Sequence, residues 1–184
     1  AALSQVCNKY GMYLYMDGAR LGYGLMAPDN DMTLVDIAAL CDVFYIGGTK
    51  VGALFGEAVV ISNENLKQDF RYFIKQKGGM LAKGRLLGVQ FDALFTDNLY
   101  WKISEHAIKL AERLRAAFEA KGYSCAVPNR TNQIFVILPD SVLEKMSDKF
   151  GYSYDHRVDD AHSVVRFCTS WATKEENVNV ICQL

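Results

Sequence analysis

The chain has 184 residues, with 20 Lys and Arg against 21 Asp and Glu, and 51% of its residues are hydrophobic. This length is typical of one domain or slightly more, and it suffices for a hydrophobic core without disulfides. The balanced charge argues against a general polyanion binder, so we expect no nucleic-acid partner. No apolar run approaches the roughly 20 residues that span a bilayer, so we expect no membrane partner.

The five cysteines are odd in number and lie far apart, at positions 7, 41, 125, 168 and 182. No pair has the spacing of a disulfide frame or a zinc site, and the three histidines show no ligand spacing either. The first residues lack the basic and apolar segments of a signal peptide. We therefore expect a cytoplasmic protein with reduced thiols and no metal. Because the chain lacks an initiator Met and residues 1–10 resemble the end of an amphipathic helix, we also expect a piece of a longer protein.

The first half of the chain alternates between strand-like and helix-like segments. Three short apolar runs predict strands, the first two of them buried: residues 11–16, 42–46 and 57–61. The third run begins only seven residues after Lys50, too soon for a parallel crossover, so we expect it to run antiparallel or to pair elsewhere in the sheet. Two segments predict helices, residues 63–75 and 84–95, and a loop rich in glycine and positive charge joins them at 75–85.

The second half predicts a long helix followed by a small α+β unit. Apolar residues recur at helical spacing from Ile103 to Phe118, and Gly122 ends the pattern. Strands are expected over residues 123–127, 133–138 and 163–169, and helices are expected to begin at capping boxes on Ser141 and Thr173. This order of elements predicts an α/β chain with a domain boundary near residue 100.

Two charged residues follow neighbouring predicted strands, Asp17 in Asp-Gly-Ala-Arg and Lys50 in Gly-Gly-Thr-Lys. Open α/β sheets place their ligands at the carboxyl ends of strands, and the glycines beside Lys50 would let a backbone approach a bound group. Singly, each residue has an ordinary interpretation, Lys50 as a solvated lysine and Asp17 as a turn partner of Arg20. Together they suit a pyridoxal phosphate site, with a Schiff-base lysine and a carboxylate that keeps the pyridine nitrogen protonated.

Arg166 is a further candidate because it lies among apolar residues on a predicted strand, where its charge needs a partner. That partner is either a structural Asp or a substrate carboxylate held in bidentate fashion. The basic loop is either a solvated turn or part of a phosphate or subunit contact, and its spacing does not separate these. Residues 22–27 match the dinucleotide pattern G-x-G-x-x-A, but Pro28 follows at once and no helix opens after a strand, so we treat the match as false.

The paired Asp-Gly-Ala-Arg and Gly-Thr-Lys motifs, with the residues around them at 14–21 and 44–50, resemble the low-specificity L-threonine aldolase family. That family belongs to the threonine aldolases and aromatic amino acid β-eliminating lyases. The resemblance covers essentially the whole chain. It implies the pyridoxal-phosphate-dependent type I fold of aspartate aminotransferase. Residues 1–100 would then be the C-terminal part of the large cofactor-binding domain, with a mixed, mostly parallel sheet, and residues 101–184 the small C-terminal α+β domain.

The resemblance also implies roles for individual residues. Lys50 would carry the cofactor and Asp17 would face its pyridine nitrogen, as the two catalytic residues of this chain. Arg20 and Arg166 would bind the substrate carboxylate, with Arg20 also beside the cofactor, and Thr49 would contact the cofactor phosphate. Lower in rank, three residues of the basic loop would lie near the phosphate or a subunit contact: Lys75, Lys83 and Arg85. Family members are about twice as long, and their phosphate-cradling loop and ring-stacking His have no counterpart in this chain.

The implied activity, as part of a longer enzyme, is retro-aldol cleavage of L-threonine or L-allo-threonine to glycine and acetaldehyde. The implied assembly is a homodimer or homotetramer with shared active sites. Two alternatives stay open. One is a related pyridoxal phosphate lyase that acts on another β-substituted amino acid, and the other is a catalytically incomplete fragment without the phosphate cradle. The general base is not expected among this chain's three histidines.

Overall fold

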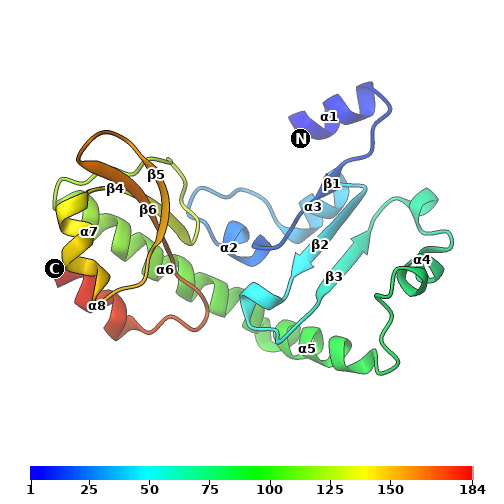
Figure 1. The fold of residues 1–184 in the computed structure, drawn as a ribbon. Helices are drawn as coiled ribbons and strands as arrows, with labels where there is room; N and C mark the ends of the chain where they lie inside the picture. The colour runs from blue at the N-terminus through cyan, green and yellow to red at the C-terminus, as the bar shows by residue number, and fades with distance from the viewer. Residues whose placement is uncertain (184) are drawn as a thin grey trace. The chain divides into compact units, whose positions relative to one another are not determined.

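A computed structural model describes residues 1–183 and divides them into two compact units. The first unit comprises Ala1–Leu25 and Asn30–Trp101, and the second comprises Met26–Asp29 and the chain from Lys102 onward. Each unit has its own three-stranded sheet (Figure 1). No helix within residues 1–183 is both long and apolar enough to cross a membrane.

The sheet of the first unit has the strand order β1-β2-β3 (Figure 1). β1 (Tyr15–Met16) runs parallel to β2 (Val43–Gly47), and β3 (Glu57–Ile61) runs antiparallel to β2. The antiparallel return of β3, one of the two arrangements expected from the short connection, is thereby confirmed. Five helices belong to this unit: α1 (Ala2–Lys9), α2 (Leu21–Leu25), α3 (Leu34–Leu40), α4 (Phe70–Gln76) and α5 (Arg85–Phe95).

The first predicted strand is shorter and more exposed than its apolar run suggested. Only Tyr15 and Met16 pair with β2, and Tyr15 is 60% exposed. The prediction of a buried strand at 11–16 was therefore wrong. Within residues 1–183, β1 pairs with β2 on one side and has no hydrogen-bonded strand on the other. On β2, Phe44 and Ile46 are buried while Tyr45 between them is half-buried, so within the described chain one face of this sheet is more deeply covered than the other.

The helix predicted over 63–75 is interrupted. A 3₁₀ turn at Glu64–Leu66 precedes α4, and between them Asp69 adopts a left-handed backbone with φ 58°. A continuous α-helix excludes such a residue, which explains the break. α3 begins at a complete capping box, in which Thr33 accepts from the Asp36 amide and the Asp36 carboxylate accepts from the Thr33 amide.

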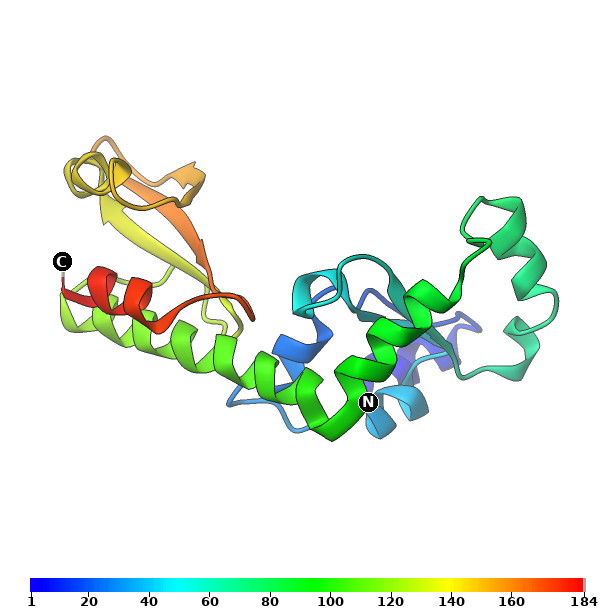
Figure 2. The same ribbon diagram turned by 90° about the horizontal axis from the view of Figure 1, so that it is seen from below.

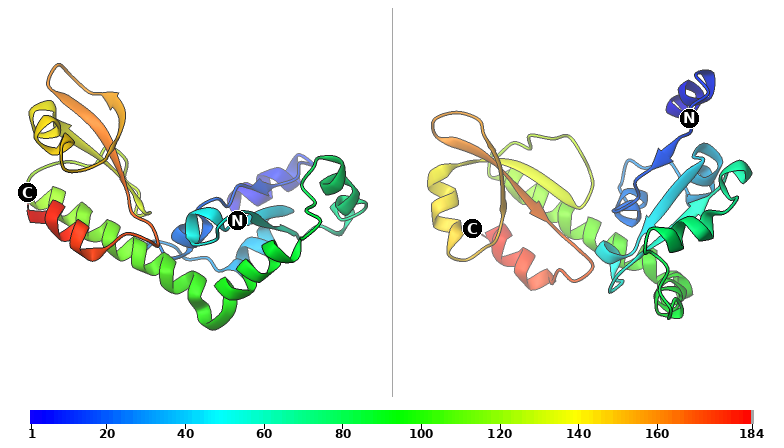
Figure 3. Two further views of the ribbon diagram at one scale, coloured as in Figure 1. Left: turned by 60° about the horizontal axis from the view of Figure 1, so that its bottom comes forward. Right: turned by 45° about the vertical axis from the view of Figure 1, so that its right-hand side comes forward.

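The predicted long helix is confirmed as α6 (Leu99–Ala120), and Gly122 follows it with a positive φ of 84°. In the second unit, α6 and α8 (Glu175–Gln183) lie side by side along one face of the second sheet (Figures 2 and 3). That antiparallel sheet has the order β4-β6-β5: β4 (Gln133–Pro139), β6 (His162–Cys168) and β5 (Ser153–Arg157). A further helix, α7 (Asp140–Ser147), follows β4.

The core of the second unit follows the alternation of the two longer strands. Every second residue of β4 is buried, and the buried side chains pack against α6, α7 and α8. The main members of this core are Leu110, Leu114, Phe118, Ile134, Val136, Leu138, Val165, Phe167 and Val178. Burial of a whole aliphatic or aromatic side chain contributes about 1.5–3 kcal/mol, so this layer holds the unit together.

Two expectations for the second unit fail for local reasons, and one of its strands was not expected. The strand predicted at 123–127 is a single bridge from Cys125 to Val136, because a turn closes at once between Val127 and Asn129. The capping box predicted at Ser141 is absent, since α7 starts after Pro139, which provides no side-chain cap. β5 was not predicted because all five of its residues are exposed, so it carries no alternating apolar signal.

Candidate functional site

Four of the five predicted site residues lie in the first unit, at the carboxyl ends of β1 and β2. Asp17 and Arg20 belong to the turn that follows β1, and Thr49 and Lys50 belong to a 3₁₀ turn, Thr49–Val51, that follows β2. Since β1 and β2 are adjacent and parallel, these two turns meet at one edge of the sheet. The side chains of Asp17 and Lys50 are exposed.

Glycine lets the two turns approach backbone to backbone. The Gly47 amide donates to the Gly18 carbonyl at 2.9 Å. A Cβ on Gly18 would lie 1.7 Å from the Tyr45 carbonyl oxygen, and one on Gly47 would lie 2.3 Å from the Ala19 carbonyl oxygen. The sequence suggested that glycines beside Lys50 admit a bound group. At Gly47 the close contact is instead with the chain itself, and it sets the positions of Asp17 and Lys50 relative to each other.

The Asp17 carboxylate is held by donors on one of its two oxygens. Its Oδ1 accepts from the Ala19 amide at 3.0 Å and from the Tyr45 hydroxyl. The Tyr45 hydroxyl and the Ala19 amide, with Lys50 and Arg20 nearby, hold the pKa of Asp17 below its usual value. Among residues 1–183, Oδ2 of Asp17 has no hydrogen-bond partner. The site therefore presents an ionised carboxylate with one oxygen available.

Hydrogen bonds anchor the backbone around Lys50, whereas no hydrogen bond or ion pair within residues 1–183 holds its amine. The Tyr23 hydroxyl donates to the Lys50 carbonyl at 2.5 Å, and the Tyr100 hydroxyl donates to the Gly47 carbonyl at 3.1 Å. The Glu57 carboxylate accepts from the Gly48 amide at 2.6 Å. The sequence did not indicate these three hydrogen bonds from Tyr23, Tyr100 and Glu57. Each is made by one polar group of a side chain, on a residue that lies far from Lys50 in the sequence or in the next strand.

Thr49 is also held by Glu57. Its hydroxyl lies 3.4 Å from Glu57 Oε1, at the outer limit of hydrogen-bond distance, and the Thr49 residue is exposed. A phosphate contact through this hydroxyl would require it to leave the carboxylate. In the described structure, the Thr49 hydroxyl therefore contacts Glu57 and helps to hold the turn that carries Lys50.

Arg166 lies in the second unit, on the central strand β6. It is opposite Phe135 of β4 and Ser153 of β5, and its Nη2 donates to the Ser153 hydroxyl at 3.4 Å. Its Nε is buried without a hydrogen-bond partner, and no carboxylate within residues 1–183 pairs with its guanidinium. The structural Asp partner considered for this residue is thus absent from the described chain. An unsatisfied cation on a central strand suits an anion supplied from outside.

The three histidines all lie in the second unit, each beside a polar partner. The Nε2 of His106 lies 2.9 Å from the Thr173 carbonyl oxygen. His156 pairs with Asp155, and His162 pairs with Asp159. In the first unit, the basic loop residues Lys75, Lys83 and Arg85 are exposed.

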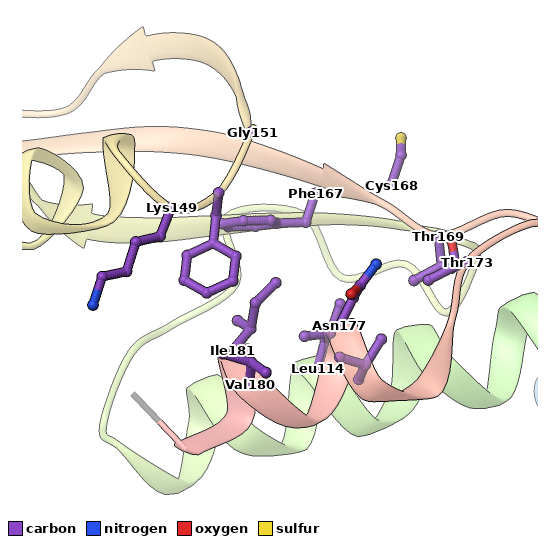
Figure 4. Close-up of a pocket in the computed structure, with 12 residues that line it drawn as sticks. Leu114, Lys149, Gly151, Phe167, Cys168, Thr169, Thr173, Asn177, Val180 and Ile181 are labelled. Atoms are coloured by element: carbon purple, nitrogen blue, oxygen red, sulfur yellow. The ribbon is translucent and has the colours of Figure 1, made fainter.

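A hollow of about 660 Å³ lies in the second unit between β6, α8 and α6. Figure 4 shows Phe167 on one side of it, Leu114 and Ile181 on the other, and the Cys168 thiol pointing away. None of the predicted site residues lines this hollow. Arg166 precedes Phe167 on β6, so strand alternation directs its side chain to the opposite face of the sheet. The candidate site is therefore the charged edge of the first sheet, with Arg166 as a separate anion-binding candidate.

Comparisons with known proteins match nearly all of this chain but only part of each relative. The low specificity L-threonine aldolase of Pseudomonas aeruginosa is 28% identical over 183 residues, which are 99% of this chain and 52% of that protein. The enzyme of the same name from a Pseudomonas species is 30% identical over 178 residues, 96% of this chain and 51% of that protein. The chain thus spans about half the length of the curated relatives it matches. No protein-family model matches it.

Solved structures extend the match to the fold. The structure of Leishmania major threonine aldolase has a TM-score of 0.96 and 43% identity, over 98% of this chain and 53% of that one. Aspartate aminotransferase of Thermus thermophilus, in a mutant form, has a TM-score of 0.65 at 14% identity, over 99% of this chain and 50% of that one, and shows the fold alone. The expected fold, part of the type I fold of aspartate aminotransferase, is confirmed. The chain is a homologue of the low specificity L-threonine aldolases over about half of their length.

Proposed function

We propose that this chain is part of a pyridoxal-phosphate-dependent enzyme that cleaves L-threonine or L-allo-threonine to glycine and acetaldehyde by a retro-aldol reaction. One observation carries the proposal: an exposed lysine and an ionised carboxylate lie together at the ends of two adjacent parallel strands. The 43% identity to the Leishmania threonine aldolase structure supports this assignment over a related lyase.

The residues at this edge of the sheet fit the cofactor. Asp17 has an oxygen, Oδ2, without a partner in the described chain, and a protonated pyridine nitrogen is a suitable donor for it. Lys50 presents an exposed primary amine for covalent attachment. Thr49 would contact the phosphate after turning from Glu57, and Arg20 would line the cofactor. When bound, pyridoxal phosphate acts as an electron sink for the bond that breaks at the substrate Cα.

We assign this chain's own residues to hold the cofactor nitrogen in its protonated form and to bind and orient the substrate. Asp17 keeps a proton on the pyridine nitrogen, because an ionised carboxylate beside it favours the protonated form. We assign Arg20 and Arg166 to the substrate carboxylate, which a guanidinium grips in bidentate fashion and thereby fixes in orientation. The base that removes the β-hydroxyl proton is not assigned to this chain's three histidines, since each is engaged by a carbonyl or a carboxylate group.

We further assign residues 1–100 to the C-terminal part of a large cofactor-binding domain and residues 101–184 to a small C-terminal domain. The enzyme would be a homodimer or homotetramer with shared active sites. Exposed apolar side chains in the first unit support further protein contacts there: Leu3, Val6, Met12, Tyr13, Leu54 and Tyr72. All five cysteines are free thiols, which supports the cytoplasm as the compartment.

The test uses the intact protein that contains this chain. We expect acetaldehyde and glycine from L-threonine or L-allo-threonine, with activity that depends on added pyridoxal phosphate. Serine, tyrosine and tryptophan are assayed separately as alternative substrates. Release of pyruvate from these amino acids, without acetaldehyde from threonine, would instead identify a β-eliminating lyase. No turnover and no cofactor binding by the intact protein would overturn the proposed activity.

Arg166→Ala is expected to lower kcat/KM for threonine about 100-fold, chiefly by raising KM. Loss of a partly buried guanidinium that pairs with an anion costs about 2–5 kcal/mol, and 1.36 kcal/mol corresponds to a factor of ten. Arg166→Lys should restore only part of the loss, because an ammonium cannot form the bidentate pair. Steady-state kinetics measure both.

Arg130→Ala is the matched control for Arg166→Ala. Arg130 also lies in the second unit, but its guanidinium pairs with Glu112 within the chain. Its loss should leave KM unchanged. A KM for Arg166→Ala equal to that of the control would remove Arg166 from the substrate site.

A further inference from the structure

Tyr45 lies on β2 with its ring beside Tyr15 and its hydroxyl on Asp17 of the candidate site. The neighbouring side chains Phe44 and Ile46 point into the buried face, so strand alternation turns Tyr45 to the other face. Its ring packs beside Tyr15 of β1, with centroids 6.3 Å apart and planes tilted by 39°. The strand backbone and this ring contact place the hydroxyl beside the turn that follows β1.

That hydroxyl contacts the one oxygen of Asp17 that is already hydrogen-bonded. Oδ1 of Asp17 accepts from both Tyr45 and the Ala19 amide, while Oδ2 has no partner within residues 1–183. Two donors on a single oxygen fix the rotation of the carboxylate about its last side-chain bond. The other oxygen is then held toward whatever lies beyond the sheet edge.

Cations nearby make this restraint necessary. Lys50 and Arg20 both attract the Asp17 carboxylate. A carboxylate free to rotate would form an ion pair with one of them, and a pair with Lys50 would occupy the amine assigned to carry the cofactor. The Tyr45 hydroxyl, a neutral donor on the face of the sheet, holds the Asp17 carboxylate away from an ion pair with Lys50.

We propose that Tyr45 is a positioning residue that fixes the Asp17 carboxylate so that its Oδ2 faces the pyridine nitrogen of the cofactor. This inference rests on the proposed function and adds to it a residue that acts through Asp17. Tyr45 takes no part in proton transfer at neutral pH, because its hydrogen bond to Asp17 raises the pKa of Tyr45 to about 12. It remains a donor throughout the working range.

The test is Tyr45→Phe in the intact protein, which removes the hydroxyl and keeps the ring beside Tyr15. We expect about tenfold weaker pyridoxal phosphate binding and about tenfold lower kcat, with a smaller change in KM, since a hydrogen bond to a charged group is worth about that factor. Tyr15→Phe is the matched control. Tyr15 contributes the other ring of the pair, and its hydroxyl has no hydrogen bond in the described structure.

The pH dependence separates positioning from packing. Tyr45 stabilises the ionised form of Asp17, so its loss raises the pKa of Asp17 toward the usual value. Asp17 then protonates at a higher pH, and the acid limb of cofactor binding, followed by visible absorbance, moves upward in Tyr45→Phe and stays in place in Tyr15→Phe. In a double-mutant cycle, Tyr45→Phe should have no further effect on cofactor binding once Asp17→Asn is present.

A readout without cofactor distinguishes this inference from the proposed function. Carboxyl NMR of the cofactor-free protein should show the Asp17 pKa rising in Tyr45→Phe. No rise, or additive effects of Tyr45→Phe and Asp17→Asn, would overturn the positioning role even in an active threonine aldolase. A rise in a protein that neither binds pyridoxal phosphate nor cleaves threonine would overturn the proposed function, and with it the direction assigned to Oδ2, while leaving the Tyr45–Asp17 contact in place.

Discussion

Lys50→Ala is expected to reduce threonine cleavage by the intact protein by about 10⁴-fold or more, as removal of a central nucleophile does in other enzymes. The fold should survive, because the chain uses the backbone of Lys50 and not its side chain. Tyr23 holds the carbonyl of Lys50, while the amine is exposed. Truncation of an exposed side chain usually changes the free energy of unfolding by less than about 0.5 kcal/mol. Acetaldehyde release and a thermal melt measure the two effects.

Covalent attachment gives an independent measurement of the same residue. Borohydride reduction of the wild-type protein with bound cofactor should leave the cofactor mass on the peptide that contains Lys50, and Lys50→Ala should leave none. Lys67→Ala is a suitable control, since Lys67 is an exposed lysine of the same unit whose ammonium pairs with Glu64. Cofactor attached to another lysine in Lys50→Ala, with activity retained, would show that the lysine was wrongly assigned.

The sequence was sufficient to predict the elements whose signals are local. The apolar stripe from Ile103 to Phe118 and the Gly122 that follows it predicted α6, and the short connection after Lys50 was compatible with the antiparallel return of β3. Loop-closure geometry and helical periodicity act within a few residues, so they are readable without a structure.

Two kinds of feature were not predicted from the sequence: contacts that depend on one side-chain atom, and elements whose residues show no apolar pattern. Tyr45 lies in an apolar run, where its ring suggested burial and nothing indicated a hydrogen bond to a residue 28 positions earlier. The left-handed Asp69 broke a helix that its neighbours' composition favoured, and the all-exposed β5 had no apolar pattern. Arg166 was noticed because its apolar neighbours are local, but its unpaired Nε became known only from the structure.

Gly18→Ala is expected to destabilise the intact protein by about 3 kcal/mol or more and to abolish cofactor binding. The added Cβ would lie 1.7 Å from the Tyr45 carbonyl oxygen, a backbone atom that no side-chain rotation can move. Relief requires the turn after β1 to separate from β2, which breaks the 2.9 Å hydrogen bond from Gly47 to Gly18. Overpacking of this kind usually costs about 1–3 kcal/mol, and a clash between two backbones lies at or above the upper end.

Gly24→Ala provides the matched comparison, because it adds the same methyl group in the same unit. Gly24 lies within α2, and a Cβ there would meet nothing within 4 Å. Alanine favours a helix over glycine by up to about 1 kcal/mol, so this variant should be neutral or slightly more stable. Urea denaturation of both variants gives the two free energies of unfolding. Equal stability for Gly18→Ala and wild type would mean that the turns after β1 and β2 do not touch. Asp17, Tyr45 and Lys50 would then lack the geometry on which the proposed site depends.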